Sequence, residues 1–282
     1  MDSKQLREAF ASRIAKEVGV RSAGLVDGLT TVPREDFVGS GPWQIMRPGK
    51  ALEGYFQTPD SDPAHIYDDV LVALDATRGL NNGQPSALVH WLDDLDLGLG
   101  DRFLHVGCGV GYYTAIAGVA VGPKGSVIGI EVDPGLAQQA ASLLKRYENV
   151  EVLLGDGLSE LPGRFDAIFV NAGCTHPPSH WLDHMAVGGR MLIPLTVASR
   201  LENIGGGQML FVTRRDESQY DAKFTGTVGI FHCEGARDSE ANDLLARAYS
   251  GKDSHVVRRL RCDTHAIDDA CWLHGPEYCL SR

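Results

Sequence analysis

An apolar segment that runs into three alternating glycines constrains the fold of this chain more than any other feature. Residues 101–115 read DRFLHVGCGVGYYTA, with glycine at positions 107, 109 and 111. Glycine lets the backbone turn sharply and approach a ligand closely, and a helix that follows presents free N–H groups at its start. The dinucleotide fingerprint G-x-G-x-x-G would need a further glycine where this chain has Tyr112. The spacing therefore predicts a nucleotide-binding turn of a different class.

Acidic residues follow the next two predicted strands. Residues 126–130 lead into Glu131 and Val132, and residues 150–154 lead into Gly155, Asp156 and Gly157. A carboxylate at the first position can accept hydrogen bonds from both hydroxyls of a ribose. The G-x-G-x-G spacing is usual in S-adenosylmethionine-dependent methyltransferases, where an acid at the second position usually meets the adenine amino group. The pattern predicts S-adenosyl-L-methionine as the cofactor, against the alternative of a structural turn with unrelated acids.

Alternating strand and helix patterns predict an α/β fold of the Rossmann-like class I methyltransferase type. We expect a doubly wound, mostly parallel sheet with an antiparallel closing strand pair. Strands are expected from residue 103 and at 126–130, 150–154, 165–170 and 188–194, with the closing pair at 206–213 and 224–230. Before them come a helix at 3–18, an irregular segment at 39–63, a strand at 67–74, a loop at 78–85 and a helix at 86–97, and a further helix is expected at 179–185.

This order of elements suggests three consecutive regions. They are an N-terminal helical and substrate-loop region at 1–85, a cofactor-binding methyltransferase domain at 86–235 and a C-terminal appendage at 236–282. The cofactor should lie at the carboxyl ends of the strands. The residues expected to bind it are His105, Gly107, Gly109, Gly111, Glu131, Val132, Asp156, Gly157 and Asn171.

The composition indicates a globular protein and restricts its partners. Hydrophobic residues make up 43% of the 282 residues, enough for a core, and the net charge is −11. Since no run of Lys and Arg offsets this charge, nucleic acid is disfavoured as a partner. No stretch approaches the ~20 apolar residues of a membrane span, and the first residues lack the apolar core of a signal peptide. We therefore expect no membrane partner and a cytoplasmic location, while the oligomeric state is not predicted.

The C-terminal tail combines cysteine with histidine. The pairs Cys262-x-x-His265 and Cys271-x-x-His274, followed by Cys279, supply enough ligands for a zinc ion. Only five residues separate the two pairs, and Trp272 and Leu273 give the segment the character of a packed core. The sequence therefore favours buried thiols and a hydrogen-bonded histidine, with no bound metal.

Five segments of the chain resemble the protein-L-isoaspartate O-methyltransferases. They are VPREDF at 32–37, VGCGVGYYTA at 106–115, VGPKGSVIGIE at 121–131, GDG at 155–157 and GGRMLIP at 188–194. The resemblance covers roughly residues 1–230. It implies that a methyl group moves from S-adenosylmethionine to a carboxylate of a peptide or protein, as an isoaspartyl or a dedicated peptide substrate.

The chain departs from that family on the substrate side. Where the family has Thr-Ile-Ser before a Gln-Pro helix, this chain has Asn81, Asn82 and Gly83, so the hydroxyl at the methyl-transfer site is missing. Side-chain amides can donate to a carboxylate without adding a charge. We therefore expect Asn82, Gly83, Gln84 and Tyr67 to bind the substrate, against the alternative that Asn82-Gly83 only forms a turn. His105 replaces an acid of the family, and is expected either to order the glycine turn or to fill the strand end.

The choice of acceptor decides whether a general base is needed. A carboxylate has an ordinary pKa of ~4 and is ionised at neutral pH, whereas an alcohol or phenol needs a base within hydrogen-bond reach. Candidate bases are His65, Tyr67, Asp68, Asp69, His176 and His180. Two other functions stay open at this point: a small-molecule O- or N-methyltransferase on the same scaffold, and a non-catalytic module that binds S-adenosylmethionine.

Overall fold

The computed structural model describes residues 2–49, 53–199, 203–251 and 253–282. The chain forms two compact units. The first comprises Met1–Asp101, Cys108–Gly129 and Asp133–Leu153, and the second comprises Arg102–Gly107, Ile130–Val132 and Leu154–Arg282. Each unit combines segments that are distant in the sequence, so neither coincides with one of the three consecutive regions expected from the sequence. That division into three regions stays a prediction.

Two helices of the first unit approach each other through a glycine. α1 (Ser3–Val18) begins at a capping box around Asp2 and confirms the helix predicted at 3–18. α2 (Ala23–Thr31), which the sequence analysis did not predict, packs against α4 (Tyr112–Val121). A Cβ atom at Gly28 would lie 2.9 Å from Ile116 Cγ2, so a larger residue would separate these helices.

Two further helices of the first unit begin with proline. They are α3 (Pro85–Asp94) and α5 (Pro134–Leu144), and proline suits this position because its fixed φ angle is helical and its missing N–H would have had no partner there. α3 ends earlier than the predicted helix at 86–97. The chain leaves the helix at Asp96, whose φ angle is +50°, in the left-handed region where helices commonly end.

A small antiparallel sheet occupies part of the segment predicted as irregular. Its strands β1 (Gln44–Met46), β2 (Phe56–Gln57), β3 (Leu71–Asp75) and β4 (Leu80–Asn81) run in the order β2-β1-β3-β4. The predictions of irregular backbone at 39–63 and of a loop at 78–85 are wrong for these strands, and the strand predicted at 67–74 begins later. Strands of two or three residues are too short to show an alternating pattern, and they depend on pairing with their neighbours.

The large sheet contains ten strands in the order β13-β14-β12-β11-β10-β9-β8-β5-β6-β7. β5 (Arg102–Val106) pairs in parallel with β8 (Phe165–Val170), and β8 pairs in parallel with β9 (Met185–Ala198). β6 (Ser126–Glu131) and β7 (Val150–Leu154) complete the parallel part that the sequence predicted. The observed α/β sheet confirms the predicted fold class.

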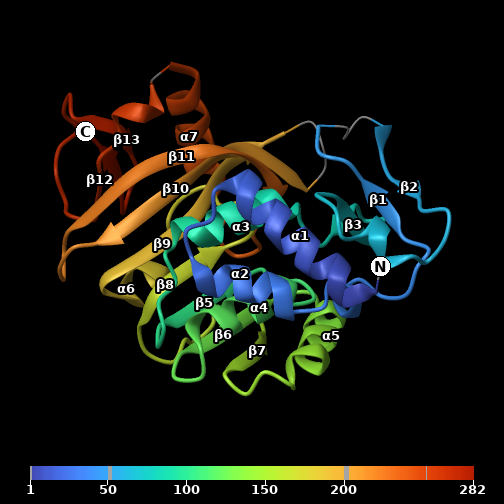
Figure 1. Cartoon of the computed structure of the whole chain (residues 1–282). Coiled ribbons are helices and arrows are strands. Elements are labelled where there is room, and N and C mark those ends of the chain that lie inside the picture. The colour runs from blue at the N-terminus through green and yellow to red at the C-terminus, as the bar shows by residue number, and fades with distance from the viewer. Residues whose placement is uncertain (1, 50–52, 200–202, 252) are drawn as a thin grey trace. The chain divides into compact units, whose positions relative to one another are not determined.

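The predicted closing pair is present and is longer than expected. β10 (Ile204–Arg214) lies antiparallel between β9 and β11 (Tyr220–Phe231), and the three long strands are prominent in Figure 1. The helix α6 (Ser179–Asp183) is shorter than the predicted helix at 179–185, because Met185 already pairs with Phe165 at the start of β9.

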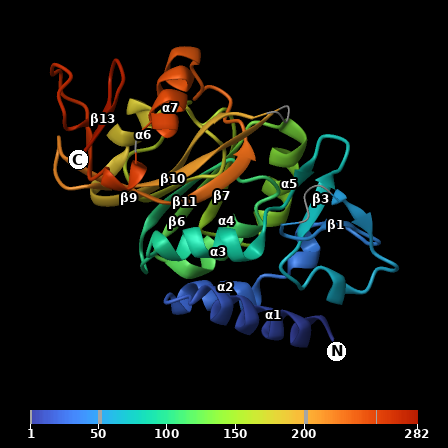
Figure 2. The same ribbon diagram turned by 90° about the horizontal axis from the view of Figure 1, so that it is seen from above.

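The C-terminal tail extends the sheet instead of folding separately. After α7 (Ser239–Gly251) and the 3₁₀ turn η4 (Ser254–Val256), β12 (Arg259–Arg261) pairs with β11. β14 (Cys279–Ser281) pairs with β12, and β13 (Cys271–His274) forms the sheet edge. α7 packs against β9 and β13. Figure 2 shows α7 beside β13.

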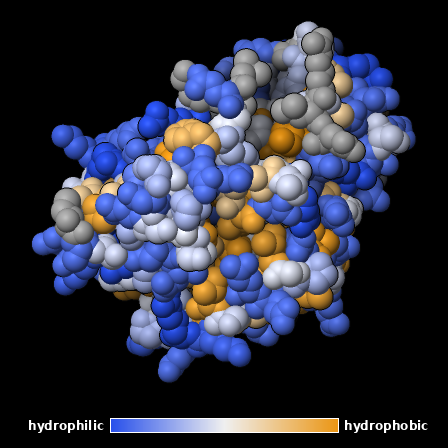
Figure 3. All heavy atoms as spheres, turned by 90° about the vertical axis from the view of Figure 1, so that its right-hand side faces the viewer, coloured by the Kyte–Doolittle hydropathy of each residue, from blue (hydrophilic) through white to orange (hydrophobic). Residues whose placement is uncertain are grey.

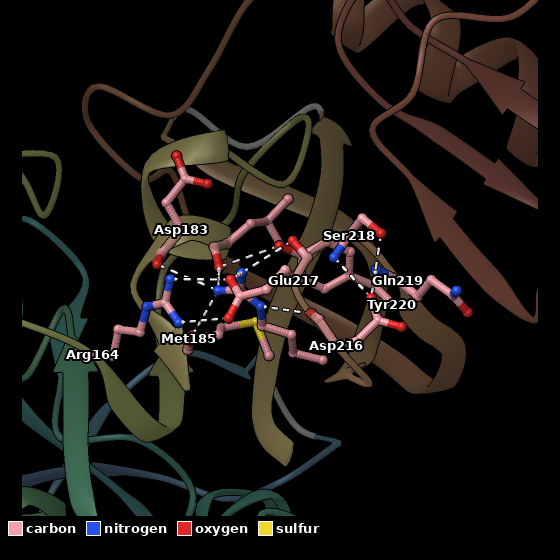
Figure 4. A network of polar contacts seen from close by, with 10 residues as sticks. Arg164, Asp183, Met185, Asp216, Glu217, Ser218, Gln219 and Tyr220 are labelled. Atoms are coloured by element: carbon pink, nitrogen blue, oxygen red, sulfur yellow. Dashed lines mark hydrogen bonds and ion pairs between the residues drawn. The ribbon is translucent and has the colours of Figure 1, made fainter. Parts of the chain in front are cut away.

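A buried arginine fixes the turn between β10 and β11. The guanidinium of Arg214 donates to the carbonyls of Met185 and Glu217, at 2.8 and 3.1 Å, and to the Glu217 carboxylate at 2.9 Å. Arg164 reaches the same carboxylate at 3.2 Å, and the resulting network is drawn in Figure 4. Because a guanidinium carries five donors, one side chain ties the turn to the start of β9.

Apolar side chains remain on the surface among a polar majority, and Figure 3 shows this for one face. The large apolar side chains that are exposed in the described part are Phe56, Leu99, Val132, Leu154, Val187 and Ile267. None of the described helices is both long and apolar enough to cross a bilayer.

Candidate cofactor and acceptor site

The strand ends expected to hold the cofactor lie side by side in the second unit. Three backbone hydrogen bonds link them: Asn171 N–H to Val106 C=O at 2.8 Å, Gly107 N–H to Ile130 C=O at 2.8 Å, and Gly155 N–H to Glu131 C=O at 3.0 Å. The side-chain amide of Asn171 also donates to the Gly107 carbonyl at 3.4 Å. Four of the expected segments therefore meet at one edge of the sheet, as in open α/β folds that bind ligands there.

The three alternating glycines have the backbone conformation that the motif requires. Gly107, Gly109 and Gly111 have φ angles of +75°, +57° and +89°, which residues other than glycine rarely adopt. A Cβ atom at Gly107 would lie 3.2 Å from the carbonyl oxygen of Asn171, so a side chain would crowd the strand ends. At Gly111 it would lie 2.6 Å from Leu144 Cδ1, so this glycine permits helix packing.

The two acids of the predicted pocket lie in different environments. Glu131 is 7% exposed, whereas Asp156 is exposed and accepts a hydrogen bond from the Leu158 N–H at 3.0 Å. Val132, beside Glu131, is 38% exposed. Gly157 has a φ angle of +82°, and its carbonyl accepts a 2.7 Å hydrogen bond from Trp181 Nε1. A buried carboxylate beside a glycine turn suits the ribose of an adenosyl group, so the residues present fit S-adenosylmethionine.

His105 lies inside the sheet, on β5. It is 1% exposed and stacks on Phe169 of the paired strand, with ring centroids 5.2 Å apart. Burial lowers the pKa of His105 to about 3, because the imidazolium would lose its hydration. The ring is therefore neutral at physiological pH. Both expected roles of His105, ordering the glycine turn and filling the strand end, stay predictions.

This burial makes stability depend on pH. The pKa of His105 is about 3 in the folded chain and ~6.5 in the unfolded chain, so below pH ~6.5 only the unfolded chain takes up the proton. The free energy of unfolding should therefore fall by about 1.4 kcal/mol per pH unit from this residue as the pH drops from ~6 towards 4. In urea titrations, His105→Phe should reduce that slope. His90→Gln, a change at an exposed histidine, should leave it unchanged, and equal slopes in all three proteins would contradict the assignment.

A segment of the tail reaches the ends of β8 and β9, which the sequence analysis did not anticipate. His232 forms an isolated bridge with Gly173, and the Thr175 N–H donates to the Ala236 carbonyl at 3.2 Å. Arg237 donates to the Gly173 carbonyl at 2.8 Å. At Gly235 a Cβ atom would lie 3.2 Å from Asp156 Oδ2, so residues 232–237 border the predicted adenine side of the pocket. Gly235 has a φ angle of +83°, in the left-handed region that favours glycine.

Of the four expected substrate residues, three make local structural contacts in the first unit. The Tyr67 hydroxyl donates to Glu35 and accepts the Arg34 N–H at 3.2 Å. The Gln84 amide donates to Asp69 and Ser86 at the start of α3. Gly83 has a φ angle of +79°, and its N–H donates to the side chain of Asn81, so this segment does form a turn.

Asn82 differs from these three residues. It is 8% exposed, and its Oδ1 accepts hydrogen bonds from Val72 N–H at 3.1 Å and from Arg34 at 3.3 Å. Its Nδ2 is buried, and no partner for it exists among the residues that the structure describes. Buried donors are nearly always paired, so this one requires an explanation.

The six candidate bases are all engaged in structural contacts. In the first unit His65 Nε2 lies 2.8 Å from Asp60 Oδ1, and the Tyr67 hydroxyl donates to Glu35. Asp68 accepts a hydrogen bond from Arg13 at 3.1 Å, and Asp69 accepts one from the Ser86 N–H at 2.8 Å. In the second unit His176 bonds Thr175 at 3.1 Å and His180 bonds the Ser159 carbonyl at 3.0 Å. Burial, with Glu35 beside it, raises the pKa of Tyr67, and burial lowers that of His176.

The cysteines and histidines of the tail are partly brought together. His265, Cys271, His274 and Cys279 place one ligand atom each within 4.8 Å of one another. Cys262 is exposed and stands outside this group. The sequence favoured plain packing of these thiols, whereas the structure shows four donor atoms that converge.

Comparison with known proteins decides the family. The sequence model of the family described as protein-L-isoaspartate(D-aspartate) O-methyltransferase matches residues 56–228. Protein-L-isoaspartate O-methyltransferase 2 of Archaeoglobus fulgidus is 32% identical over 222 residues, which cover 77% of this chain and 87% of that protein. The chain belongs to this family. A second relative, the protein-L-isoaspartate O-methyltransferase of Ignicoccus hospitalis, is 32% identical over 69% of this chain and 83% of its own length.

Solved structures agree on the fold. A protein-L-isoaspartate O-methyltransferase superposes with a TM-score of 0.65 and 22% identity, covering 86% of this chain and 69% of its own. A putative protein-L-isoaspartate O-methyltransferase from Plasmodium falciparum, in complex with S-adenosyl-L-homocysteine, superposes with a TM-score of 0.60 and 16% identity. The superposition covers 81% of this chain and 98% of that protein. The predicted family, the Rossmann-like fold, a methyltransferase activity and S-adenosylmethionine as cofactor are thereby confirmed.

Proposed function

We propose that this protein transfers a methyl group from S-adenosylmethionine to a carboxylate of a peptide or protein. Family membership supports the reaction class. The observation that carries the choice of acceptor is the engagement of all six candidate bases in structural hydrogen bonds. An alcohol or phenol acceptor would need one of them as a base, whereas a carboxylate is already ionised.

In this proposal the cofactor is held along the strand ends of the second unit. Glu131 would accept hydrogen bonds from the ribose, Asp156 would meet the adenine amino group, and the turn at Gly107 would let the backbone approach closely. Val132, Gly157 and Asn171 would line the same edge, and Gly109 and Gly111 follow Gly107 along the chain. When bound, S-adenosylmethionine supplies an electrophilic methyl carbon with a neutral thioether leaving group. The protein contributes positioning and the partial removal of water from the anion.

We assign to Asn82 the binding of the acceptor carboxylate. Its buried Nδ2 is a donor without a partner in the described part of the chain, and a substrate carboxylate would satisfy it. The contacts of Oδ1 with Arg34 and Val72 hold the amide in one orientation. In the resemblance to the family the serine hydroxyl falls at Gly83, the residue next to Asn82. Tyr67, Gly83 and Gln84 then shape this segment by positioning Asn82.

The deciding experiment follows the chemistry of the product. The protein is incubated with methyl-labelled S-adenosylmethionine and an isoaspartyl peptide, and in parallel with the peptide of the same sequence that contains ordinary aspartate. A methyl ester releases its label as methanol in alkali, so base-labile label in either peptide supports the proposal. Label that survives alkali would support a small-molecule or N-methyl acceptor instead. Label in the isoaspartyl peptide alone identifies a repair substrate, whereas label in the aspartyl peptide points to a dedicated one.

Asn82→Asp should lower kcat/KM by about tenfold to a hundredfold, mostly through KM. The change keeps an oxygen for Arg34 and Val72 but replaces the donor with a negative oxygen that repels the substrate anion. Gln57→Ala, at an exposed amide of β2, is the matched control. If Asn82→Asp retains wild-type KM while its unfolding curve is also unchanged, Asn82 does not contact the acceptor.

The cytoplasmic location expected from the sequence also stays a prediction.

A further inference from the structure

The edge strand β13 and its neighbour β14 align three potential metal ligands on one face. β13 and β14 are antiparallel, with His274 opposite Cys279, Leu273 opposite Leu280, and Cys271 opposite Ser281. Residues that face each other across such a pair point to the same side of a sheet, and sides alternate along β14. In a regular strand Cys271 and His274 would point to opposite faces. The bulge between Cys271 and Leu273 places one extra residue in β13, so that Cys271 points to the same side of the sheet as His274. Cys271, His274 and Cys279 therefore share one face.

A fourth donor comes from the loop before β13. His265 Nε2 lies 3.7 Å from Cys271 Sγ, and His274 Nδ1 lies 4.0 Å from the same sulfur. All four donor atoms lie within 4.8 Å of one another. A tetrahedral zinc ion with ordinary Zn–S and Zn–N bonds holds its ligand atoms about 3.3–3.8 Å apart. The observed separations are therefore close to those of a zinc site, and small side-chain rotations would close the difference.

The surroundings of the cluster orient its ligands. His265 Nδ1 lies 2.9 Å from the carbonyl oxygen of Asp263, which can only accept a hydrogen bond. The proton of a neutral His265 is therefore on Nδ1, and Nε2 presents its lone pair towards Cys271. The Asp268 N–H donates to Cys271 Sγ at 3.5 Å, and an Asp268 carboxylate oxygen lies 3.4 Å from that sulfur. This carboxylate adds negative charge beside the Cys271 sulfur, an environment that favours a bound cation.

We propose that His265, Cys271, His274 and Cys279 bind one zinc ion with a structural role. Two sulfurs and two imidazoles are a ligand set that selects zinc, and four protein ligands leave no open position for catalysis. The ion fixes the loop at 262–270 to β13 and β14. Through Trp272, which packs edge-on against Tyr249 of α7 at 5.7 Å between ring centroids, it supports the whole tail. The cluster lies beyond residue 228, where the match to the family model ends, so the site is a feature of this chain's appendage.

Metal analysis of the full chain tests the proposal without reference to activity. Protein purified under reducing conditions should contain about one zinc ion per chain by plasma mass spectrometry. Cys271→Ser and Cys279→Ser should each lower the zinc content about tenfold, since they remove a thiolate ligand. Cys262→Ser is the matched control, because this exposed cysteine lies outside the cluster, and it should retain the wild-type content.

Cobalt substitution of the unmodified chain gives a second readout that does not depend on the folding of the variants. Reduced, metal-depleted protein titrated with Co²⁺ should develop the intense visible bands of a tetrahedral site and a sulfur-to-cobalt charge-transfer band, saturating at about one ion per chain. Zinc should then displace the cobalt. Absence of both zinc and cobalt from the reduced wild-type chain would overturn the proposal, as would a loss of metal in Cys262→Ser equal to that in Cys271→Ser.

Discussion

Arg34→Met is expected to lower the free energy of unfolding by about 3–5 kcal/mol. Arg34 is fully buried in the first unit, and its guanidinium donates to the carbonyls of Asp68 and Val70 at 2.9 and 2.7 Å and also to that of Ile66. Methionine fills a similar volume but leaves these buried carbonyls without a donor. Each hydrogen bond to a charged group contributes about 1.5–3 kcal/mol, and an unsatisfied buried acceptor adds its own cost.

The matched control for this change is Arg13→Met. Arg13 also donates to a backbone carbonyl of this segment, that of Tyr67, at 2.8 Å, but half of its side chain is exposed. We therefore expect the free energy of unfolding to fall by less than about 1 kcal/mol. Urea unfolding followed by circular dichroism measures both, with an unchanged m-value showing that only stability has changed. Similar midpoints for the two variants would contradict the assigned role of Arg34. A further consequence is that Arg34→Met removes one of the two donors to Oδ1 of Asn82, so the KM for the acceptor should rise.

Glu131→Ala is expected to weaken the binding of S-adenosylhomocysteine at least about a hundredfold. If the buried carboxylate accepts two ribose hydroxyls, as we propose, alanine removes two hydrogen bonds to a charged group, each of which contributes about 1.5–3 kcal/mol. Glu131→Gln keeps one acceptor oxygen of the side chain without the charge and should lie between the two. Isothermal titration calorimetry gives the dissociation constants directly.

A change at an exposed glutamate separates this effect from a general change in charge. Glu151→Ala, on β7, removes the same charge and should bind S-adenosylhomocysteine as the wild type does. Thermal unfolding provides an independent check, because a ligand at 100 times its dissociation constant stabilises the folded chain by about 2.7 kcal/mol. That stabilisation should disappear in Glu131→Ala. A dissociation constant within about threefold of wild type would exclude the ribose contact.

Local features of the sequence predicted the strands and the glycine turn that we propose hold the cofactor. Positive φ angles at Gly107, Gly109 and Gly111 follow from residue type, because only glycine adopts them without strain. Alternating apolar runs predicted the strands that end at Val106, Glu131 and Val170. These signals are short in range, so a single sequence contains them in full. Recognition of the family rested on the same segments, and the comparisons confirmed it.

The acceptor side and the tail depended on contacts between distant residues. The unused donor of Asn82 exists because Arg34, 48 residues away, and Val72 occupy the other end of its amide. The approach of Gly235 to Asp156 depends on strand order, and no local pattern of either segment encodes it.

The sequence by itself thus determined the parallel strands of the large sheet, the glycine turn and the class of cofactor, because backbone sterics and hydrophobic periodicity act over a few residues. Only the tertiary structure decided that Nδ2 of Asn82 has no partner in the described part of the chain, and that Cys271, His274 and Cys279 converge. A single bulge in β13 reverses the side on which a residue points, and pairing with β14 fixes where it lies. Such outcomes follow from packing and hydrogen-bond pairing between distant segments, and a linear pattern of residues does not contain them.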